Sequence, residues 1–349
     1  METKTEISPG NVNGAPSAAA GGEVVDVLLL QLGTPAAPTA AALRPYLREF
    51  LGDGRVLEMP RWLRWILVNL VIVPFRAPKS AAKYANIWDP KEGSPLLSIT
   101  RKQTKLLAEA LGPGYRVNFG MRYGEPSIPS LVRKLAEAGC RKLVVIPMFP
   151  QYSGTTTASG LDALFDALKQ ERIIPSIRVV SEYHDYPEYI EAVAATIERR
   201  LDEARSQGHE PDAKIISFHG IPIDYIKRGD PYMRQSSATA KLVAKKLGWK
   251  KGEYRITFQS RFGKQKWLLP YFDETIKELG AKGAKSVLVA QPGFTADCLE
   301  TIDEIGREGK EDFEGAGGEH LIRVECLNDA PEFIAALASL ARREARGWR

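Results

Sequence analysis

Four short hydrophobic runs, each closed by a turn that contains glycine or proline, dominate the pattern along the chain. Apolar residues occupy consecutive positions in these runs, which is typical of strands that are buried on both faces of a parallel sheet. Amphipathic segments with helical spacing separate the runs, and this alternation predicts an α/β fold with helices on both sides of parallel sheets. The runs are residues 24–32 before "GTP", 143–146 before "PMFPQYS", 214–218 before "HGIP" and 286–290 before "QPGFTAD".

The two halves of the chain echo each other around the first and third runs. "LLLQLGTP" and "IISFHGIP" align Gly33 with Gly220, which places Leu32 opposite His219. "LAEAGCRKLVVIPMFPQYS" and "IKELGAKGAKSVLVAQPGFTAD" also align once one residue before the proline is skipped. This weak duplication predicts two similar α/β domains whose strand ends face a shared cleft, where a ligand would bind.

His219 stands at the end of the third run, between Phe218 and the turn formed by Gly220 and Pro222. Open α/β sheets usually place their chemistry at this end of a strand, and a neutral imidazole can serve there as a base or as a metal ligand. A histidine that is only packed at the edge of a core fits the same position. The residues alone leave both interpretations open.

Four acidic residues follow the last run. Asp297, Glu300, Glu304 and Glu308 are three, four and four positions apart, so an α-helix would place them on one face. A capping box explains the first two, and a solvated acidic face could explain the others. The functional alternative is a row of oxygen ligands that leads a divalent cation or protons to the cleft, where His219 would complete a mixed site suited to ferrous iron.

The longest apolar run is "WLRWILVNLVIVPF" at residues 62–75. It is too short to span a bilayer, and Arg64 and Asn69 interrupt it. The run predicts either an ordinary buried helix, a hydrophobic lip over an apolar substrate, or a surface that touches a membrane.

Composition excludes several classes of protein. The chain has 349 residues, 44% of them hydrophobic, and a net charge of +5 without a long basic run, so two globular domains are expected and nucleic-acid binding is not. Three cysteines without CxxC spacing indicate a reducing compartment, and residues 1–22 have the composition of a disordered leader. The sequence lacks the GxGxxG, GxxxxGK[ST], GxSxG and HExxH motifs.

Eight motifs in one order make the chain resemble the ferrochelatases, enzymes that insert ferrous iron into a porphyrin to make haem. The resemblance spans about residues 24–340, and the sequences of the motifs are similar to those of proteobacterial, protoporphyrin-type members. It implies a chelatase fold of two Rossmann-like domains with the porphyrin between them. The motifs are "LGTP" at 32–35, "GSPL" at 93–96, "GMRYGEPSI" at 120–128, "PQYS" at 150–153, "SFHGIP" at 217–222, "RGDPY" at 228–232, "FQSRFG" with "WL" and a proline at 258–270, and "PGFTADCLETIDEI" at 292–305.

The resemblance also assigns expected roles to individual residues. His219 and Glu300 would be catalytic and form the inner site for iron and protons, and Asp297, Glu304 and Glu308 would continue it outward. Leu32 would face the macrocycle from the opposite side. The remaining expected substrate contacts are Arg76, Tyr84 and Ser94 toward the propionates, Arg122, Tyr123 and Tyr152 in the pocket wall, and Trp267 and Phe294 as aromatic contacts.

Two departures from the family pattern affect the expected cofactors. Cys298 stands where animal members have a histidine, which puts a metal-relay role at that position in doubt. The cysteine-bearing extension that binds a [2Fe–2S] cluster in some members is missing, so no cluster and no permanently bound cofactor are expected. Ferrous iron and protoporphyrin IX would be the substrates.

The expected organisation is an α/β domain of residues 23–180 completed by a C-terminal helix at 331–349, and a second α/β domain of residues 181–330. The expected location is the cytoplasm, with peripheral contact to the inner membrane through residues 62–75 as an alternative. A chelatase for cobalt or sirohydrochlorin, or a protein that binds haem or metal without turnover, are the rival functions.

Overall fold

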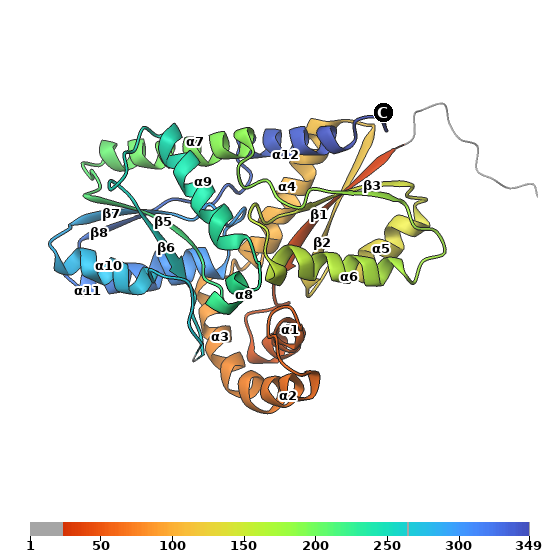
Figure 1. Ribbon diagram of the computed structural model, residues 1–349, viewed down its shortest axis with the longest axis horizontal. Helices are drawn as coiled ribbons and strands as arrows, with labels where there is room; N and C mark the ends of the chain where they lie inside the picture. The colour runs from red at the N-terminus through yellow and green to blue at the C-terminus, as the bar shows by residue number, and fades with distance from the viewer. Residues whose placement is uncertain (1–23, 264, 349) are drawn as a thin grey trace, which may run out of the picture.

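Two four-stranded parallel sheets lie side by side at the centre of the protein (Figure 1). The computed structural model describes residues 24–263 and 265–348, so the leader predicted over residues 1–22 lies outside the described residues. The strand orders are β2-β1-β3-β4 and β6-β5-β7-β8, and every pair is parallel. The strands are β1 Val25–Gly33, β2 Tyr115–Tyr123, β3 Lys142–Pro147, β4 Ser176–Val179, β5 Ala213–His219, β6 Arg255–Gln259, β7 Ser286–Ala290 and β8 His320–Arg323.

The second sheet repeats the order of the first with each strand number raised by four. The four predicted runs are β1, β3, β5 and β7, which are the two central strands of each sheet. The predicted α/β class with two similar parallel-sheet units is therefore confirmed.

Helices cover both faces of the sheets. The layer drawn above the sheets in Figure 1 contains α4, α7, α9 and α12, and the layer below contains α5, α6, α10 and α11. The helices are α1 Ala40–Gly52, α2 Arg61–Ile66, α3 Val73–Ile87, α4 Pro95–Leu111, α5 Ile128–Glu137, α6 Ser159–Leu168, α7 Pro187–Ser206, α8 Ile223–Lys227, α9 Tyr232–Lys246, α10 Phe272–Ala281, α11 Gly309–Gly315 and α12 Pro331–Glu344, with π-helical segments η1 Leu67–Ile72, η2 Gly154–Ala158 and η3 Glu300–Glu308.

One hydrophobic cluster runs beneath the upper layer and joins the two sheets. It contains Val27 and Leu29 of β1 together with Leu288 and Ala290 of β7, and it is completed by side chains of α4, α7 and α12. Helix α12, formed by the end of the chain, packs against both α4 and α7. The predicted return of the C-terminal helix to the first domain stays a prediction, because α12 packs alike against α4, from the first half of the chain, and α7, from the second half.

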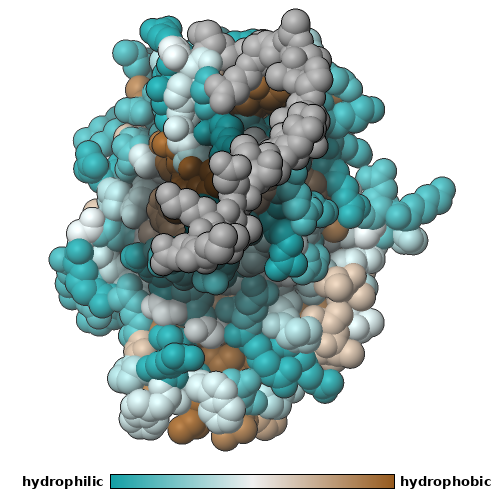
Figure 2. Space-filling view, turned by 90° about the vertical axis from the view of Figure 1, so that its right-hand side faces the viewer, coloured by the Kyte–Doolittle hydropathy of each residue, from teal (hydrophilic) through white to brown (hydrophobic). Residues whose placement is uncertain are grey.

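Most residues of the apolar run at 62–75 are exposed, although Val68 and Val73 are buried. It forms α2, η1 and the start of α3, which project from the sheets at the lower end of the molecule in Figure 1, and we call this segment the lip. Trp62, Trp65, Leu70 and Phe75 are 60–73% exposed, so the buried-helix interpretation is wrong. Hydrophobic atoms come to the surface at this end in the space-filling view (Figure 2). None of the helices formed by the described residues is long and apolar enough to cross a membrane.

Candidate active site

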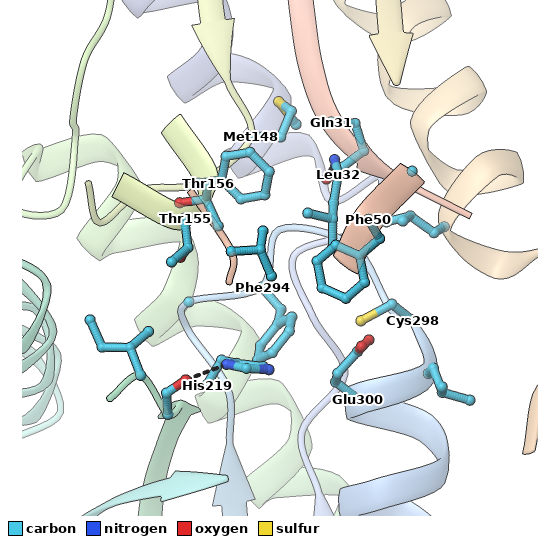
Figure 3. Close-up of a pocket in the computed structure, with 18 of the residues that line it drawn as sticks. Gln31, Leu32, Phe50, Met148, Thr155, Thr156, His219, Phe294, Cys298 and Glu300 are labelled. Atoms are coloured by element: carbon cyan, nitrogen blue, oxygen red, sulfur yellow. Dashed lines mark hydrogen bonds between the residues drawn. The ribbon is translucent and has the colours of Figure 1, made fainter. Parts of the chain in front are cut away.

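A large pocket lies at the carboxyl ends of the strands of both sheets (Figure 3). The space between its walls measures about 1290 Å³ when the open solvent at its mouth is counted. Its walls come mainly from the turns after β1, β3, β5 and β7, with further side chains from α1 and from the end of α3, as a cleft between two sheets requires. The predicted site residues that line it are Leu32, Tyr84, Ser94, His219, Trp267, Phe294 and Glu300.

His219 ends β5 and is partly buried against the pocket. Its Nδ1 lies 2.6 Å from the carbonyl oxygen of Gly220. A carbonyl only accepts, so this contact assigns the proton to Nδ1 and leaves Nε2 with a free lone pair. Burial lowers the pKa of His219 below its usual value, and the positive charge of Arg76 acts in the same direction, while Glu300 opposes both. The imidazole is therefore neutral at pH 7 and can accept a proton.

Gly220 explains why the strand ends so abruptly after the histidine. A Cβ at this position would lie 2.9 Å from the carbonyl oxygen of Gln259 and 3.3 Å from the ring of Trp267. Only a glycine lets the turn pass this close to β6, whose last residue accepts the Gly220 backbone N–H at 2.8 Å. The turn thus holds the imidazole at the pocket wall.

Glu300 begins η3 and lines the pocket on the same side as His219. In Figure 3 the free ring nitrogen of His219 points toward the Glu300 carboxylate, and the Cys298 sulfur lies beside that carboxylate. Gln259 donates to the backbone carbonyl of Glu300 at 2.8 Å, which ties the start of η3 to the end of β6. Burial and the charge of Glu300 raise the pKa of the Cys298 thiol well above its usual value, so Cys298 presents a neutral S–H.

Glu304 and Glu308 continue from Glu300 along η3 toward the surface. The three residues lie four positions apart, and we call them the acidic row. The carboxylate of Glu304 accepts a hydrogen bond from the Ser260 hydroxyl. Burial, reinforced by the charge of Glu300, raises its pKa to about 7. Glu308, which is 37% exposed, pairs with Lys83 at 2.7 Å.

Asp297 does not share the face of the acidic row, and this part of the prediction is wrong. It precedes η3 and is buried, and its carboxylate binds the Arg323 guanidinium at 2.6 Å, the Thr301 hydroxyl at 2.7 Å and the Asn328 amide at 2.8 Å. The expected capping box with Glu300 is also not formed, since no side chain caps η3. Asp297 therefore anchors the turn before η3.

Hydroxyl groups gather at a different part of the pocket, and one arginine lies near that part without lining it. Ser94 accepts the Thr34 hydroxyl at 2.8 Å, and Tyr84 is buried beside Tyr46. Arg76 does not line the pocket, but its guanidinium lies 5.4 Å from the ring centre of Phe262, which does. These groups offer hydrogen-bond donors to an acidic substituent of a ligand.

Arg122, Tyr123 and Tyr152 do not line the pocket, which corrects their predicted place in its wall. Arg122 and Tyr123 end the edge strand β2 and turn toward Asp53 at the end of α1, at 2.6 and 2.8 Å. Ser159 completes this buried network by donating to Asp53 at 2.5 Å. Tyr152 is partly buried, and its backbone N–H is held by the side chain of Gln235 at 2.6 Å. Of the three, Tyr123 packs against the pocket residue Phe50, with ring centres 5.0 Å apart.

Several residues that line the pocket were not predicted from the sequence. Facing His219, Leu32 is joined by Phe50 of α1 and by Met148 after β3 in an apolar wall (Figure 3). Met148 follows a predicted strand directly, so its position was a usable signal, whereas Phe50 lies on a helix whose pattern gave none. The wall also contains two buried polar atoms without a partner among the described residues, Gln31 Nε2 and Thr156 Oγ1.

These features define a class of protein: an α/β enzyme that holds a large apolar ligand between two parallel sheets, against one neutral imidazole and one carboxylate. Within residues 24–263 and 265–348, no group of three or more histidine, cysteine, aspartate or glutamate side chains is arranged to hold a metal ion. The class alone does not name the ligand.

Comparison with known proteins gives the family. The model of the ferrochelatase family matches residues 25–345, and the chain belongs to this family. It is 48% identical over 325 residues to the ferrochelatase of Herminiimonas arsenicoxydans, covering 92% of this chain and 87% of the relative. It is 44% identical over 337 residues to that of Mesorhizobium japonicum, covering 96% and 95%. Among solved structures, SirB from Bacillus subtilis with Fe3+ has 16% identity and a TM-score of 0.48, covering 73% of this chain and 93% of that one.

Proposed function

We propose that the protein is a ferrochelatase, a lyase that inserts Fe(II) into protoporphyrin IX and releases protohaem, the last step of haem biosynthesis. Membership of the family and the shared name of its proteobacterial relatives support this function. The observation that carries the proposal is the convergence of His219, from the end of β5, and Glu300, from the start of η3, on one apolar pocket.

His219 is the proposed acceptor of the pyrrole protons. Insertion of iron requires the loss of two N–H protons from the macrocycle. The Nε2 lone pair is available because Nδ1 donates to Gly220, and the lowered pKa keeps the ring neutral until it takes a proton. The Glu300 carboxylate on the same side stabilises the imidazolium formed and receives the proton.

The apolar wall has a mechanical role in the proposal. The nitrogen lone pairs of a porphyrin lie in the ring plane, and bending the ring exposes them to an approaching ion. Leu32, Phe50 and Met148 press on the macrocycle from the face opposite His219, and binding energy from the apolar pocket supplies the strain. Leu32 and Phe50 carry no atom that can ligate the product iron.

The acidic row is the proposed path of iron and protons between solvent and the pocket. Oxygen ligands suit a divalent cation, and Glu308, Glu304 and Glu300 follow one another from the surface inward. A pKa of about 7 lets Glu304 carry a proton near neutral pH. Arg76, Tyr84 and Ser94 are the proposed partners of the two propionates at another part of the pocket.

Ferrous iron is a substrate in this proposal, and no permanently bound cofactor takes part. Cys140, Cys298 and Cys326 are buried and not joined in disulfides. The absence of a [2Fe–2S] cluster stays a prediction, which iron and sulfide analysis of the purified protein can test.

Anaerobic assay of the purified protein with protoporphyrin IX and Fe(II) tests the function. Repeated turnover with the absorption spectrum of haem is expected. Formation of at most one spectral equivalent per protein would favour a protein that binds haem or metal without catalysis. Turnover only with sirohydrochlorin, or only with Co(II), would assign the pocket to the rival chelatase chemistry.

Peripheral membrane contact through the lip belongs to the same proposal, with the cytoplasmic face of the inner membrane as its place. Trp62, Trp65 and Phe75 are exposed side chains of the kind that enter a bilayer interface. Sedimentation with vesicles of phosphatidylglycerol and phosphatidylcholine should carry down the protein. The variant Trp62→Ser/Trp65→Ser should remain in the supernatant while it keeps its turnover with detergent-dispersed porphyrin, and equal sedimentation of both proteins would refute the contact.

A further inference from the structure

The outer end of the acidic row is closed by a lysine from another part of the chain. Lys83 Nζ lies 2.7 Å from Glu308 Oε1, and both side chains are 37% exposed. Lys83 belongs to α3, while Glu308 is the last residue of η3. The ammonium group of Lys83 is therefore bound to the Glu308 carboxylate, which is the first carboxylate of the row that an incoming divalent cation would meet.

Arg307, the other cation near Glu308, is bound more firmly. Its guanidinium holds the buried Asp303 with two contacts, at 2.7 and 3.1 Å, and reaches Glu311 at 3.0 Å. Its contact with Glu308 is the longer one at 3.2 Å. Lys83, in contrast, pairs with Glu308 alone among the described residues. A lysine on a flexible stem with one partly exposed partner is displaced at small cost, whereas an arginine with several partners is not.

We propose that Lys83 gates the acidic row by occupying Glu308 until a divalent cation displaces it. The inference rests on the proposed function, because it gives the row the task of metal delivery. A doubly charged ion binds the carboxylate more strongly than the ammonium does, so Lys83 swings into solvent when metal arrives. At low metal concentration the ammonium returns, and it shields the row from monovalent cations of the medium.

The gate is tied to the porphyrin pocket through α3. Tyr84, the residue after Lys83, lines the pocket, and Asn86 two residues further donates to Asp303 of η3 at 3.1 Å. One helix thus contacts the ligand pocket and two positions of η3. A ligand that shifts Tyr84 also shifts Lys83 relative to Glu308, because a helix moves as a unit.

Steady-state kinetics of Lys83→Met separates the gate from ordinary surface charge. We expect the KM for Zn(II) or Fe(II) to fall about two- to five-fold, the scale of one partly exposed ion pair, with kcat and the KM for porphyrin unchanged. Lys83→Arg should resemble the wild type. Lys79→Met is the matched control, since Lys79 is exposed one turn earlier on the same helix and its loss changes the net charge equally. Lys83→Gln provides a second neutral variant if Lys83→Met folds poorly.

A double variant identifies the partner. In the Glu308→Gln background, Lys83→Met should no longer lower the KM for metal. An unchanged or raised KM in Lys83→Met, or the same fall in Lys79→Met, would overturn the gate. If the wild type shows no turnover at all, the proposed function fails instead. Binding of Mn²⁺ measured by electron paramagnetic resonance then still tests the gate, because Lys83→Met should bind Mn²⁺ more tightly than the wild type, and equal affinity would overturn it.

Discussion

The ends of β1 and β5 are built alike and carry opposite chemistry. Each strand occupies the same place in its sheet, and each has a glycine at its end, Gly33 as the last residue of β1 and Gly220 directly after β5, which lets the neighbouring strand approach. A Cβ on Gly33 would lie 1.8 Å from the Tyr123 carbonyl oxygen, and one on Gly220 would lie 2.9 Å from that of Gln259. The residue before the glycine is Leu32 in one sheet and His219 in the other.

This difference shows where function resides in a duplicated scaffold. The repeated parts are the strand order and the tight turn, which position a side chain at the cleft. The unrepeated part is the side chain itself. One turn therefore contributes an apolar surface and the other a base, and a ligand between them meets two chemically unequal faces.

The largest effect on kcat is expected from replacing the two polar side chains of the pocket. His219→Ala and Glu300→Gln should each reduce kcat about 10²- to 10⁴-fold, the range of a lost general base, with circular dichroism and melting temperature close to those of the wild type. Leu32→Ala should cost less than about tenfold, since it removes only apolar contact. Near-normal rates in both polar variants would show that the two faces are not unequal in the way described.

Replacing Gly33 by alanine should destabilise the protein more than replacing Gly220 by alanine. Gly33 has a φ of 114°, a conformation that favours glycine, and its added Cβ would collide with a backbone oxygen. Gly33→Ala should therefore lower the free energy of unfolding by about 3 kcal/mol or more. Gly220→Ala should cost about 1–2 kcal/mol, because its backbone needs no such conformation. Urea titrations of both variants measure the difference, and equal losses would break the comparison of the two turns.

Replacing the apolar residue by its counterpart tests whether the two turns really face each other. Leu32→His should offer product iron a second axial nitrogen, give a low-spin haem spectrum and slow steady-state turnover about tenfold by retaining haem, while a single-turnover burst survives. Wild-type release with a stable fold would contradict the facing geometry. An unstable protein without a burst would mean that Leu32 serves only the core.

The hydrogen-bond network of Asp53, which holds the apolar wall through Tyr123 and Phe50, should make the stability of the protein depend on pH. Phe50 packs against Tyr123 with ring centres 5.0 Å apart, and Tyr123 donates to Asp53. Burial tends to raise the pKa of Asp53, but hydrogen bonds from Ser159, the Arg55 backbone and Tyr123, with the charge of Arg122, outweigh it and hold the pKa below its usual value.

Asp53→Asn should accordingly lower the free energy of unfolding by about 1–3 kcal/mol at pH 7. A lowered pKa stabilises the fold above the ordinary aspartate value of 3.8, and this contribution is lost as the pH falls through the native pKa. The deficit of the variant should thus shrink below about pH 4 in thermal melts. A deficit that persists unchanged at pH 3 would assign Asp53 no ionic role.

The smallest effect is expected from variants in the outer part of the acidic row. Glu304→Gln and Glu308→Gln should each raise the KM for metal about two- to five-fold, in line with the loss of one oxygen charge, and leave the KM for porphyrin within error. Matched changes in both constants, or none, would reduce the acidic row to a solvated face.

The sequence predicted the parts of the fold that are buried on both sides. The central strands β1, β3, β5 and β7 are continuous apolar runs, while the edge strands carry mixed patterns, as in "SIRV" of β4 or "HLIR" of β8, and passed unnoticed. An edge strand packs less of its surface, so its hydrophobic pattern is weak. The exposed lip was ambiguous for the opposite reason, because apolar residues without a partner look like core.

The site was predictable where chemistry follows a strand end and not elsewhere. His219 and Glu300 follow predicted strands, and the structure places both at the pocket. The predicted position of Asp297 was wrong because the prediction extended an α-helical spacing to a residue that precedes a π-helix. The carboxylate of Asp297 forms an ion pair with Arg323 instead. Arg122 and Tyr123 were placed in the pocket wall by resemblance, whereas their contacts with Asp53 follow from the position of α1, which no local pattern encodes.

The hydrophobic cluster that joins the two sheets limits how the molecule can move. Because Val27 and Leu29 share one core with Leu288 and Ala290 under a common layer of helices, a hinge between the sheets would have to tear apolar contacts that both halves need. The shared core therefore holds the strand ends that frame the pocket in place relative to each other. The lip contributes no residue to the pocket lining and carries its large apolar side chains at the surface, so the frame of the pocket and the exposed apolar surface belong to different parts of the chain.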